Sequence, residues 1–331
     1  MREADAPVLA DLATRLNVEA YALSALGPSQ RQLGPALGGW LAELRRRVAA
    51  ATVENLRRDA ELSGALDRLA EAGIDLIFLK GSALRLVELG RAGRFQCDVD
   101  VLLRRPDLER AEALLTGLGF RLDESYLDRE DLLRRHFHLG FERRGAVVEL
   151  HWDVDAASPQ GFVERLWDAS REVAADGRPR RVLSPAHQLL FGCLHLSRHA
   201  FRGGLRWLAD LKPLLALDAG AAARFGAEAE GWPPRAVRCP LWLLADLGVT
   251  EAAALAADGG ADPVERALLR RLLVPLLLDE PWMGIPAWRL EHALRAWLFS
   301  ERSLPGLLAE ASGQGMSGRL RAWAAGAEAR T

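Results

Sequence analysis

Three short pieces of the sequence carry side chains whose types and spacing could do chemistry: "LKGSALRL", "DVDVLL" and "VELHWDV". Asp98 and Asp100 are spaced i, i+2 on a predicted strand, so both side chains project to one face. Carboxylates held that close repel each other, and a divalent cation such as Mg2+ or Mn2+ removes the penalty. If the strand of Glu149 is a neighbour, three carboxylates can hold one or two ions, as in two-metal phosphoryl or nucleotidyl transfer.

The first piece places Lys80 directly before Gly81 and Ser82, where an apolar run ends and a helical pattern begins. A glycine lets the backbone approach a phosphate closely, and N–H groups at a helix start point at it. Lys80 is one of only two lysines in the chain, and we expect it to add a cationic contact to the same phosphates. The structural alternatives are a surface lysine, an ordinary strand-to-helix turn and, for the two aspartates, a solvent-facing strand start.

Other polar residues have spacings that suit a pocket. His195 and His199 are spaced i, i+4 on a predicted helix. Because there is neither a third ligand nor an HExxH pattern, we expect core or pocket histidines there rather than a zinc site. His151 follows the candidate glutamate by two residues, so it faces the same side and either supports the metal cluster or is a half-buried structural histidine. Arg206 and Asp210 fit a helix ion pair or a role in the pocket.

The elements that must position these side chains follow from hydrophobic spacing. The first 72 residues show helical leucine spacing, which Gly73 ends in the manner of a C-cap. The pattern then runs strand, helix, strand, helix and hairpin over 74–79, 82–90, 98–103, 106–119 and 136–154. From about Ser184 the spacing is helical again. We therefore predict an α+β fold with three parts: N-terminal helices at 1–72, a small mixed β-sheet core at 73–155 and a C-terminal helical domain at 156–331.

Together these pieces resemble the DNA polymerase beta-like nucleotidyltransferase superfamily, in which a Gly-Ser loop precedes an Asp-x-Asp pair and a later carboxylate. More closely, they resemble its uncharacterised nucleotidyltransferase family, through the "LKG" loop, an arginine before the aspartates, "ELHW" and "LRWLADL". The resemblance runs from about Asn55 to Leu215. It implies the following roles: Asp98 and Asp100 as metal ligands, Glu149 as the third carboxylate that activates the acceptor, Gly81 and Ser82 as contacts of the β- and γ-phosphates, and Lys80 and Arg94 as supporting charges. Glutamate at 149 departs from the aspartate that is commoner in the superfamily.

The composition limits the classes of partner and compartment. Lys+Arg total 43 against 45 Asp+Glu, a net charge of -2, which does not favour a protein that holds long nucleic acid. Cys97, Cys193 and Cys239 are far apart and lack CxxC spacing, so they predict neither a disulfide framework nor a zinc knuckle. With no signal-peptide pattern and no apolar run of membrane length, we expect a cytoplasmic protein, and the Ala, Leu and Arg bias suggests a bacterial one.

The leading functional hypothesis is an Mg2+-dependent enzyme that transfers a nucleoside monophosphate from an NTP to an acceptor and releases pyrophosphate. The fold does not name the acceptor, and the charge balance favours a small molecule. One alternative is a toxin-like enzyme acting on tRNA or protein, for which Arg134-Arg135 and Arg143-Arg144 either supply local positive charge or are solvated surface. Another is a catalytically silent nucleotide-binding protein; a phosphohydrolase fits the Gly-Ser loop less well. The sequence leaves the base, the acceptor and the oligomeric state open.

Overall fold

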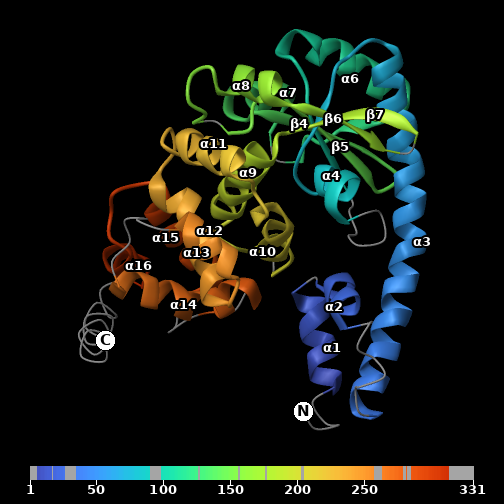
Figure 1. Cartoon of the computed structure of the whole chain (residues 1–331). Helices are drawn as coiled ribbons and strands as arrows, with labels where there is room; N and C mark the ends of the chain where they lie inside the picture. Colours follow the sequence, from blue (N-terminus) through green and yellow to red (C-terminus); the bar gives the residue numbers. More distant parts are fainter. Residues whose placement is uncertain are drawn as a thin grey trace. The chain divides into compact units, whose positions relative to one another are not determined.

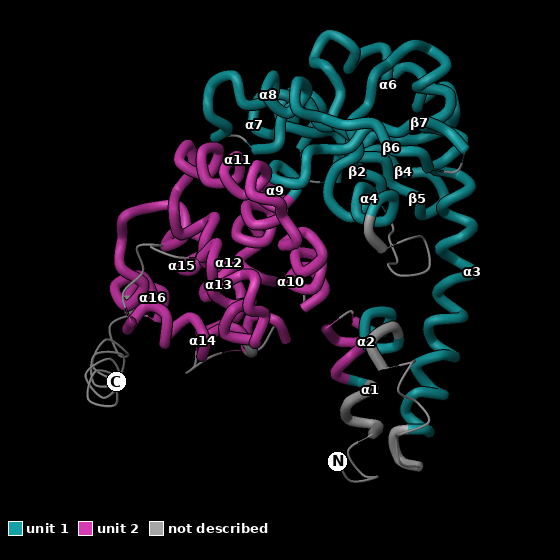
Figure 2. The backbone as a smooth tube through the Cα atoms, viewed as in Figure 1, with its two compact units in different colours: residues 1–11, 19–188 teal, residues 12–18, 189–331 magenta. Residues whose placement is uncertain are grey.

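The structure is a computed structural model that divides into two compact units, shown in two colours in Figure 2. Unit 1 comprises Met1–Asp11 and Glu19–Gln188, and unit 2 comprises Leu12–Val18 and Leu189–Thr331. The described residues are 6–16, 18–26, 35–89, 98–125, 127–155, 157–175, 177–202, 205–256, 263–278, 281 and 285–312. Within these ranges, no helix has the length and apolar character needed to cross a membrane. The three-part division at 72/73 and 155/156 stays a prediction.

Unit 1 is built on a seven-stranded mixed sheet with the strand order β3-β4-β5-β2-β1-β7-β6. Figure 1 shows this sheet together with the long helix α3 (Pro35–Glu71). The central strand β2 pairs with β5 in parallel and with β1 antiparallel, and β1 pairs with β7 in parallel. The strands are β1 (Ile77–Phe78), β2 (Asp98–Leu102), β3 (Arg121–Leu122), β4 (His138–Arg143), β5 (Ala146–His151), β6 (Arg171–Ala175) and β7 (Arg178–Val182). This sheet and its helices confirm the predicted α+β class.

The other regular elements of the described residues are helices. Unit 1 contains α2 (Glu19–Leu26), α3 (Pro35–Glu71), α4 (Lys80–Leu84), the π-helix η3 (Arg85–Leu89), the 3-10 helix η4 (Arg105–Asp107), α6 (Leu108–Gly117), α7 (Arg129–Arg135) and α8 (Phe162–Ala169). Two helices run across the division of the chain, α1 (Ala6–Arg15) and α9 (Pro185–Arg198). Unit 2 contains α10 (Leu205–Leu211), the 3-10 helix η5 (Lys212–Leu215), α11 (Ala219–Ala229), α12 (Pro234–Asp246), α13 (Thr250–Ala256), α14 (Pro263–Leu278), α15 (Ala287–Leu298) and α16 (Leu304–Ser312).

One face of the sheet is packed and the other is left for polar side chains. Alternate residues of the three adjacent strands β2, β5 and β4 join one hydrophobic core with leucines of α3 and α6: Val99, Val101, Val148, Leu150, Leu139 and Phe141. Because side chains alternate along a strand, the residues between them must project to the opposite face. That second set includes Asp98 and Asp100 on β2 and Glu149 on β5. The apolar pattern of the strands therefore decides which face carries the carboxylates.

The β4–β5 hairpin follows the prediction closely, and the turn chemistry explains it. Arg144 and Gly145 both have positive φ, 52° and 76°, which is the backbone of a type I′ two-residue turn. Glycine enters the left-handed region without steric cost. The predicted end of the first long helix is also found, because α3 stops at Glu71 and Gly73 has a φ of 72°.

Other elements differ from the sequence prediction. The first strand is short, since only Ile77 and Phe78 have ladder partners, and the helix expected after it splits into α4 and η3. The β6–β7 hairpin was not predicted, and it adds two strands within the segment 156–331 that the sequence marked as helical. Its strands are rich in arginine and only Val182 is buried, so they lack the apolar alternation that signals a strand.

Candidate active site

The neighbouring strands β2 and β5 bring the candidate carboxylates together. Their parallel register pairs Asp100 with Glu149 and Asp98 with Val147, so both carboxylate strands are adjacent, as the sequence hypothesis required. Asp100 is buried at 3% exposure, whereas Asp98 and Glu149 are partly buried. A carboxylate so deeply buried is stable in its charged form only if other groups compensate its charge.

Lys80 and His151 supply that compensation. The Lys80 Nζ atom lies 2.5 Å from Asp100 Oδ1 and 3.3 Å from Glu149 Oε2. The His151 Nε2 atom lies 3.1 Å and 3.2 Å from the same two oxygen atoms. The imidazole is fully buried, so its hydrogen bonds are not shared with bulk solvent. Two carboxylates, one ammonium group and one imidazole therefore form a single compact cluster.

The mutual effects of these groups appear in their pKa values. Burial alone would lower the pKa of the Lys80 ammonium, but the charges of Asp100 and Glu149 raise it above its ordinary value. Burial would raise the pKa of Glu149, yet its hydrogen bond with His151 and the charge of Lys80 hold it below the usual range. Burial would likewise lower the pKa of His151, whereas its hydrogen bonds to the two carboxylates raise it. The charged forms of Lys80, Glu149 and His151 are thus stabilised by their neighbours in the cluster.

The backbone at Lys80 has an unusual conformation, which accompanies the contact of its ammonium group with Asp100 and Glu149. Lys80 has a φ of 45°, in the left-handed region that non-glycine residues avoid at a cost of about 1–3 kcal/mol. Two hydrogen bonds hold the residues on either side of Lys80 against β2. The Leu79 N–H donates to the Asp100 carbonyl at 3.0 Å, and the Asp100 N–H donates to Ser82 Oγ at 3.2 Å. Gly81 and Ser82 are both buried. The strained residue is therefore fixed beside the carboxylates by its neighbours on both sides.

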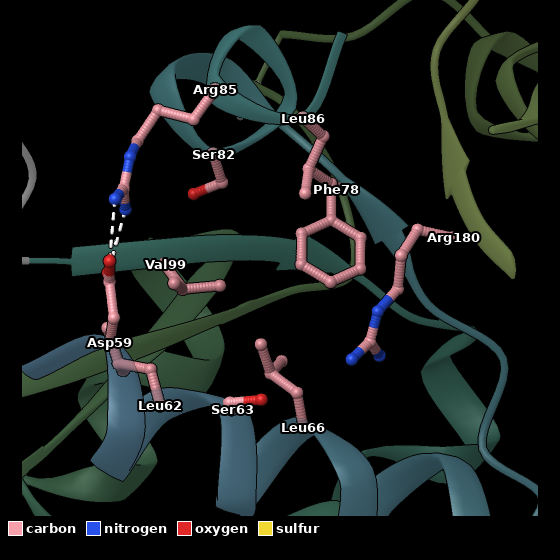
Figure 3. Close-up of a pocket in the computed structure, with 10 residues that line it drawn as sticks. All are labelled: Asp59, Leu62, Ser63, Leu66, Phe78, Ser82, Arg85, Leu86, Val99 and Arg180. Atoms are coloured by element: carbon pink, nitrogen blue, oxygen red, sulfur yellow. Dashed lines mark hydrogen bonds and ion pairs between the residues drawn. The ribbon is translucent and has the colours of Figure 1, made fainter. Parts of the chain in front are cut away.

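A buried ion pair attaches the segment after Ser82 to the long helix α3 (Figure 3). The Arg85 guanidinium donates to both oxygens of Asp59, at 2.8 Å and 2.6 Å, and both side chains are at most 7% exposed. Beside the pair lies a small cavity of about 60 Å³, whose walls include Phe78, Val99 and Arg180. Neither partner was singled out in the sequence, because residues 26 positions apart give no local signal of pairing.

His138 is a further member of the site that sequence reasoning missed. It pairs with His151 across the β4–β5 ladder, and the two rings stack with centroids 4.8 Å apart. Burial, followed by the charge of His151, lowers the pKa of His138 to about 4, so this imidazole is neutral near neutral pH. The signal was present in the predicted hairpin, since a tight turn at Arg144-Gly145 puts these two histidines opposite each other.

The remaining candidates lie elsewhere or cannot be placed. Arg94 falls outside the described residues. His195 and His199 are in contact with each other in unit 2, with ring centroids 4.6 Å apart, and both rings also contact Trp207. Asp210 is buried and Arg206 is partly buried on α10 in the same unit. A role for these four residues in a pocket stays a prediction.

The cluster has the donor set of a site for a divalent cation. Ligand atoms of Asp100, Glu149 and His151 all lie within 4.8 Å of one another. Carboxylate oxygens suit Mg2+ and Mn2+, and an imidazole adds a ligand that Mn2+ also accepts. A divalent cation would meet the same need that Lys80 meets here, which is positive charge between two buried carboxylates. Asp98 is outside this group of three but projects to the same face.

Part of the chain is similar to several solved structures. Among solved structures, the chain is similar to the antibiotic-resistance factor ANT(2'')-Ia in solution, with 18% identity, a TM-score of 0.34, and coverage of 67% of this chain and 96% of that one. A crystal structure of ANT(2'')-Ia with adenylyl-2''-tobramycin matches at 18% identity and a TM-score of 0.32, covering 64% and 95% of the two chains. An antigenic nucleotidyltransferase-like protein from Paracoccidioides brasiliensis matches at 17% identity and a TM-score of 0.40, covering 60% and 92%.

The search among curated proteins finds no match. A family model, however, matches residues 2–245, which is most of the chain and includes every member of the Asp100 cluster. That model describes uncharacterised nucleotidyltransferases. The match confirms the resemblance drawn from "LKGSALRL", "DVDVLL" and "VELHWDV", and it identifies the chain as an enzyme of the transferase class. The chain belongs to the family of uncharacterised nucleotidyltransferases.

Proposed function

We propose that the protein transfers a nucleoside monophosphate from an NTP to a hydroxyl group of a small-molecule acceptor, with Mg2+ as cofactor and pyrophosphate as the second product. The observation that carries the proposal is the in-register pair Asp100–Glu149, with Lys80 Nζ within 3.3 Å of both carboxylates. In this reaction the acceptor oxygen forms a bond to the α-phosphorus, and the bond from the α-phosphorus to the bridging oxygen breaks. The leaving pyrophosphate takes that oxygen with it.

The residues of the cluster have distinct proposed roles. Glu149 accepts the proton of the attacking hydroxyl, a role that its position at the more open side of the pair supports. Asp98, Asp100 and Glu149 hold the metal, which would offset the charge of the triphosphate and polarise the α-phosphate. Lys80 offsets the negative charge of Asp100 and Glu149, and with Gly81, Ser82 and Arg94 it is proposed to contact the nucleotide. His151 orients both carboxylates through its two hydrogen bonds.

A nucleic-acid acceptor has less support. The two arginine pairs that could attract RNA already form ion pairs with acidic residues of this chain. Arg143 and Arg144 lie 3.5 Å and 3.1 Å from Glu61. Arg134 and Arg135 lie 2.9 Å and 3.4 Å from Asp131. Exposed ion pairs are weak, so these contacts lower the local positive charge without abolishing it. We therefore keep a small molecule as the acceptor and tRNA or protein as the alternative.

Calorimetry with each NTP, in Mg2+ and in EDTA, is the direct test. We expect binding that requires the metal, that is lost in the double variant Asp98→Asn/Asp100→Asn and that is kept in the control Asp75→Asn, an exposed acid just before β1. The protein is then incubated with the preferred NTP, labelled at its α-phosphate, and with the low-molecular-mass fraction of a cell extract. We expect the label to appear on a small molecule. Failure of every NTP to bind would refute the proposal, and binding without any label transfer would favour the silent nucleotide-binding alternative.

A further inference from the structure

A second feature of unit 1 concerns the acceptor. The inference drawn from it rests on the proposed function, because both involve Glu149. A cavity of about 710 Å³ opens over β3, β4 and β5, and Glu149 is part of its wall. We propose that this cavity binds the acceptor, and that the acceptor is a small molecule carrying both a hydroxyl group and a positively charged amine. The volume lies within the roughly 300–1,000 Å³ that is usual for small-molecule sites.

The position of the cavity separates the two substrates. In the strand order β3-β4-β5-β2-β1, the Asp100–Glu149 pair sits on the central strands β2 and β5. Lys80, Gly81 and Ser82 follow β1, on one side of that pair. The cavity lies over the strands on the other side, with Glu149 as the shared boundary. A nucleotide held by the Lys80 segment and an acceptor held in the cavity would thus meet at the carboxylate pair from its two sides, which leaves room for both substrates at once.

Gly140 opens the cavity directly beside Glu149. It lies in the interior of β4, and the β4–β5 ladder places it opposite Glu149. A Cβ atom at this position would meet only the Asp123 Cβ atom, at 4.0 Å, and Gly140 does not have a positive φ. The fold therefore does not need glycine here, although glycine weakens a strand interior. Glycine at such a position is characteristic of a strand that a ligand approaches closely, and here it leaves room next to the candidate base.

The charges around the cavity decide the class of ligand. Asp123, Glu142 and Glu149 contribute three carboxylates to the lining, and Arg121 contributes one guanidinium, 4.0 Å from Glu142. Because Lys80 Nζ lies 3.3 Å from Glu149 and offsets its charge, Asp123 and Glu142 carry the negative excess over Arg121. Asp123 accepts a hydrogen bond from the Ser125 N–H at 3.0 Å, and Glu142 accepts one from the Gly145 N–H at 2.6 Å. These bonds hold both carboxylates in fixed orientations at the rim. A triphosphate or an RNA backbone would be repelled by this lining, whereas a protonated amine would be attracted.

The remaining walls suit the carbon frame of such a ligand. Leu122, Leu127 and Leu132 give the apolar part of the lining, and the ring of His138 also lines the cavity. The hydroxyl of the ligand would point to Glu149, which takes its proton, and the amine would face Asp123 and Glu142. The same cavity thus provides the base for the reacting oxygen and the counter-charges for the amine.

The test uses three hexoses of similar size and different charge near neutral pH: glucosamine as the cation, glucose as the neutral sugar and glucuronate as the anion. Binding of each to the full chain is measured by saturation-transfer NMR without nucleotide, so that the cavity is assayed separately from the transferase reaction. We expect glucosamine to bind roughly tenfold or more tightly than the other two. The variant Glu142→Gln should remove most of that preference, whereas the control Glu109→Gln, at an exposed position on α6, should keep it.

A second variant fills the space without touching the charges. Gly140→Leu should abolish sugar binding, while Gly64→Leu, at an exposed position of α3 with open space around its Cβ, should not. NTP binding is measured on the same samples and should be unchanged in both variants. Equal binding of the three sugars, or native sugar binding by Gly140→Leu, would overturn the proposal. Absence of NTP binding by the native chain would instead refute the proposed function. The sugar result would still show whether the cavity binds a cationic ligand.

Discussion

The buried ion pair between Asp59 on α3 and Arg85 on η3 makes a quantitative prediction about stability. The pair is bidentate, with N–O distances of 2.8 Å and 2.6 Å, and the exposed fraction of the side chain is 5% for Arg85 and 7% for Asp59. Substituting Arg85→Met keeps most of the volume but leaves the Asp59 carboxylate buried without its counter-charge. Removing one partner of a buried pair costs about 3–5 kcal/mol, a large part of the roughly 5–15 kcal/mol that holds a typical domain folded.

The double variant separates the charge effect from the packing effect. When Asp59→Leu is added to Arg85→Met, no charge is left unpaired, and the free energy of unfolding should return to within about 1 kcal/mol of the native value or exceed it. The apolar neighbours Leu62 and Leu66 on α3 can then pack against the new side chains. The coupling energy of the mutant cycle should therefore be about 3 kcal/mol or more.

Urea denaturation followed by circular dichroism measures these free energies. The matched control is Arg68→Met on the same helix, whose partner Glu71 lies 2.9 Å away but whose side chains are 61% and 60% exposed. That control should cost less than about 1 kcal/mol. If Arg85→Met costs no more than Arg68→Met, the Asp59 carboxylate is solvated in the folded protein, and the reasoning from burial is wrong.

Two further predictions concern the cluster and the cysteines. Lys80→Met should lower the free energy of unfolding in EDTA by about 1.5–3 kcal/mol, because the two carboxylates lose a charged hydrogen-bond donor. Mg2+ should restore more stability to this variant than to the native chain, and equal restoration would argue against a metal site at these oxygens. Cys193 and Cys239 are buried, and burial raises the pKa of both thiols, so iodoacetamide should label them only after unfolding. Peptide mass mapping checks this, and rapid labelling of Cys193 in the native protein would contradict it.

Much of the site was predictable because its signals are local. The spacing of Asp98 and Asp100 places both on one face of any strand that contains them, whatever surrounds it. The turn at Arg144-Gly145 defines a hairpin, and the hairpin register then places His138 opposite His151. By contrast, nothing in the sequence of β6 and β7 marks them as strands. Strand β6 lies at the edge of the sheet, and in the two strands only Val182 is buried, so the alternation that identifies a buried strand is weak.

The sequence by itself determined the fold class, the family and the carboxylates, because these depend on short patterns in the chain. Only the tertiary structure decided which strands are neighbours, and hence that Asp100 and Glu149 share Lys80 and His151. It also decided that Lys80 turns toward the carboxylates through a left-handed backbone, and that Gly140 leaves a cavity beside Glu149. The physical reason is that charge compensation and empty space arise from residues far apart in the chain, and the distances between those residues exist only once the sheet has formed.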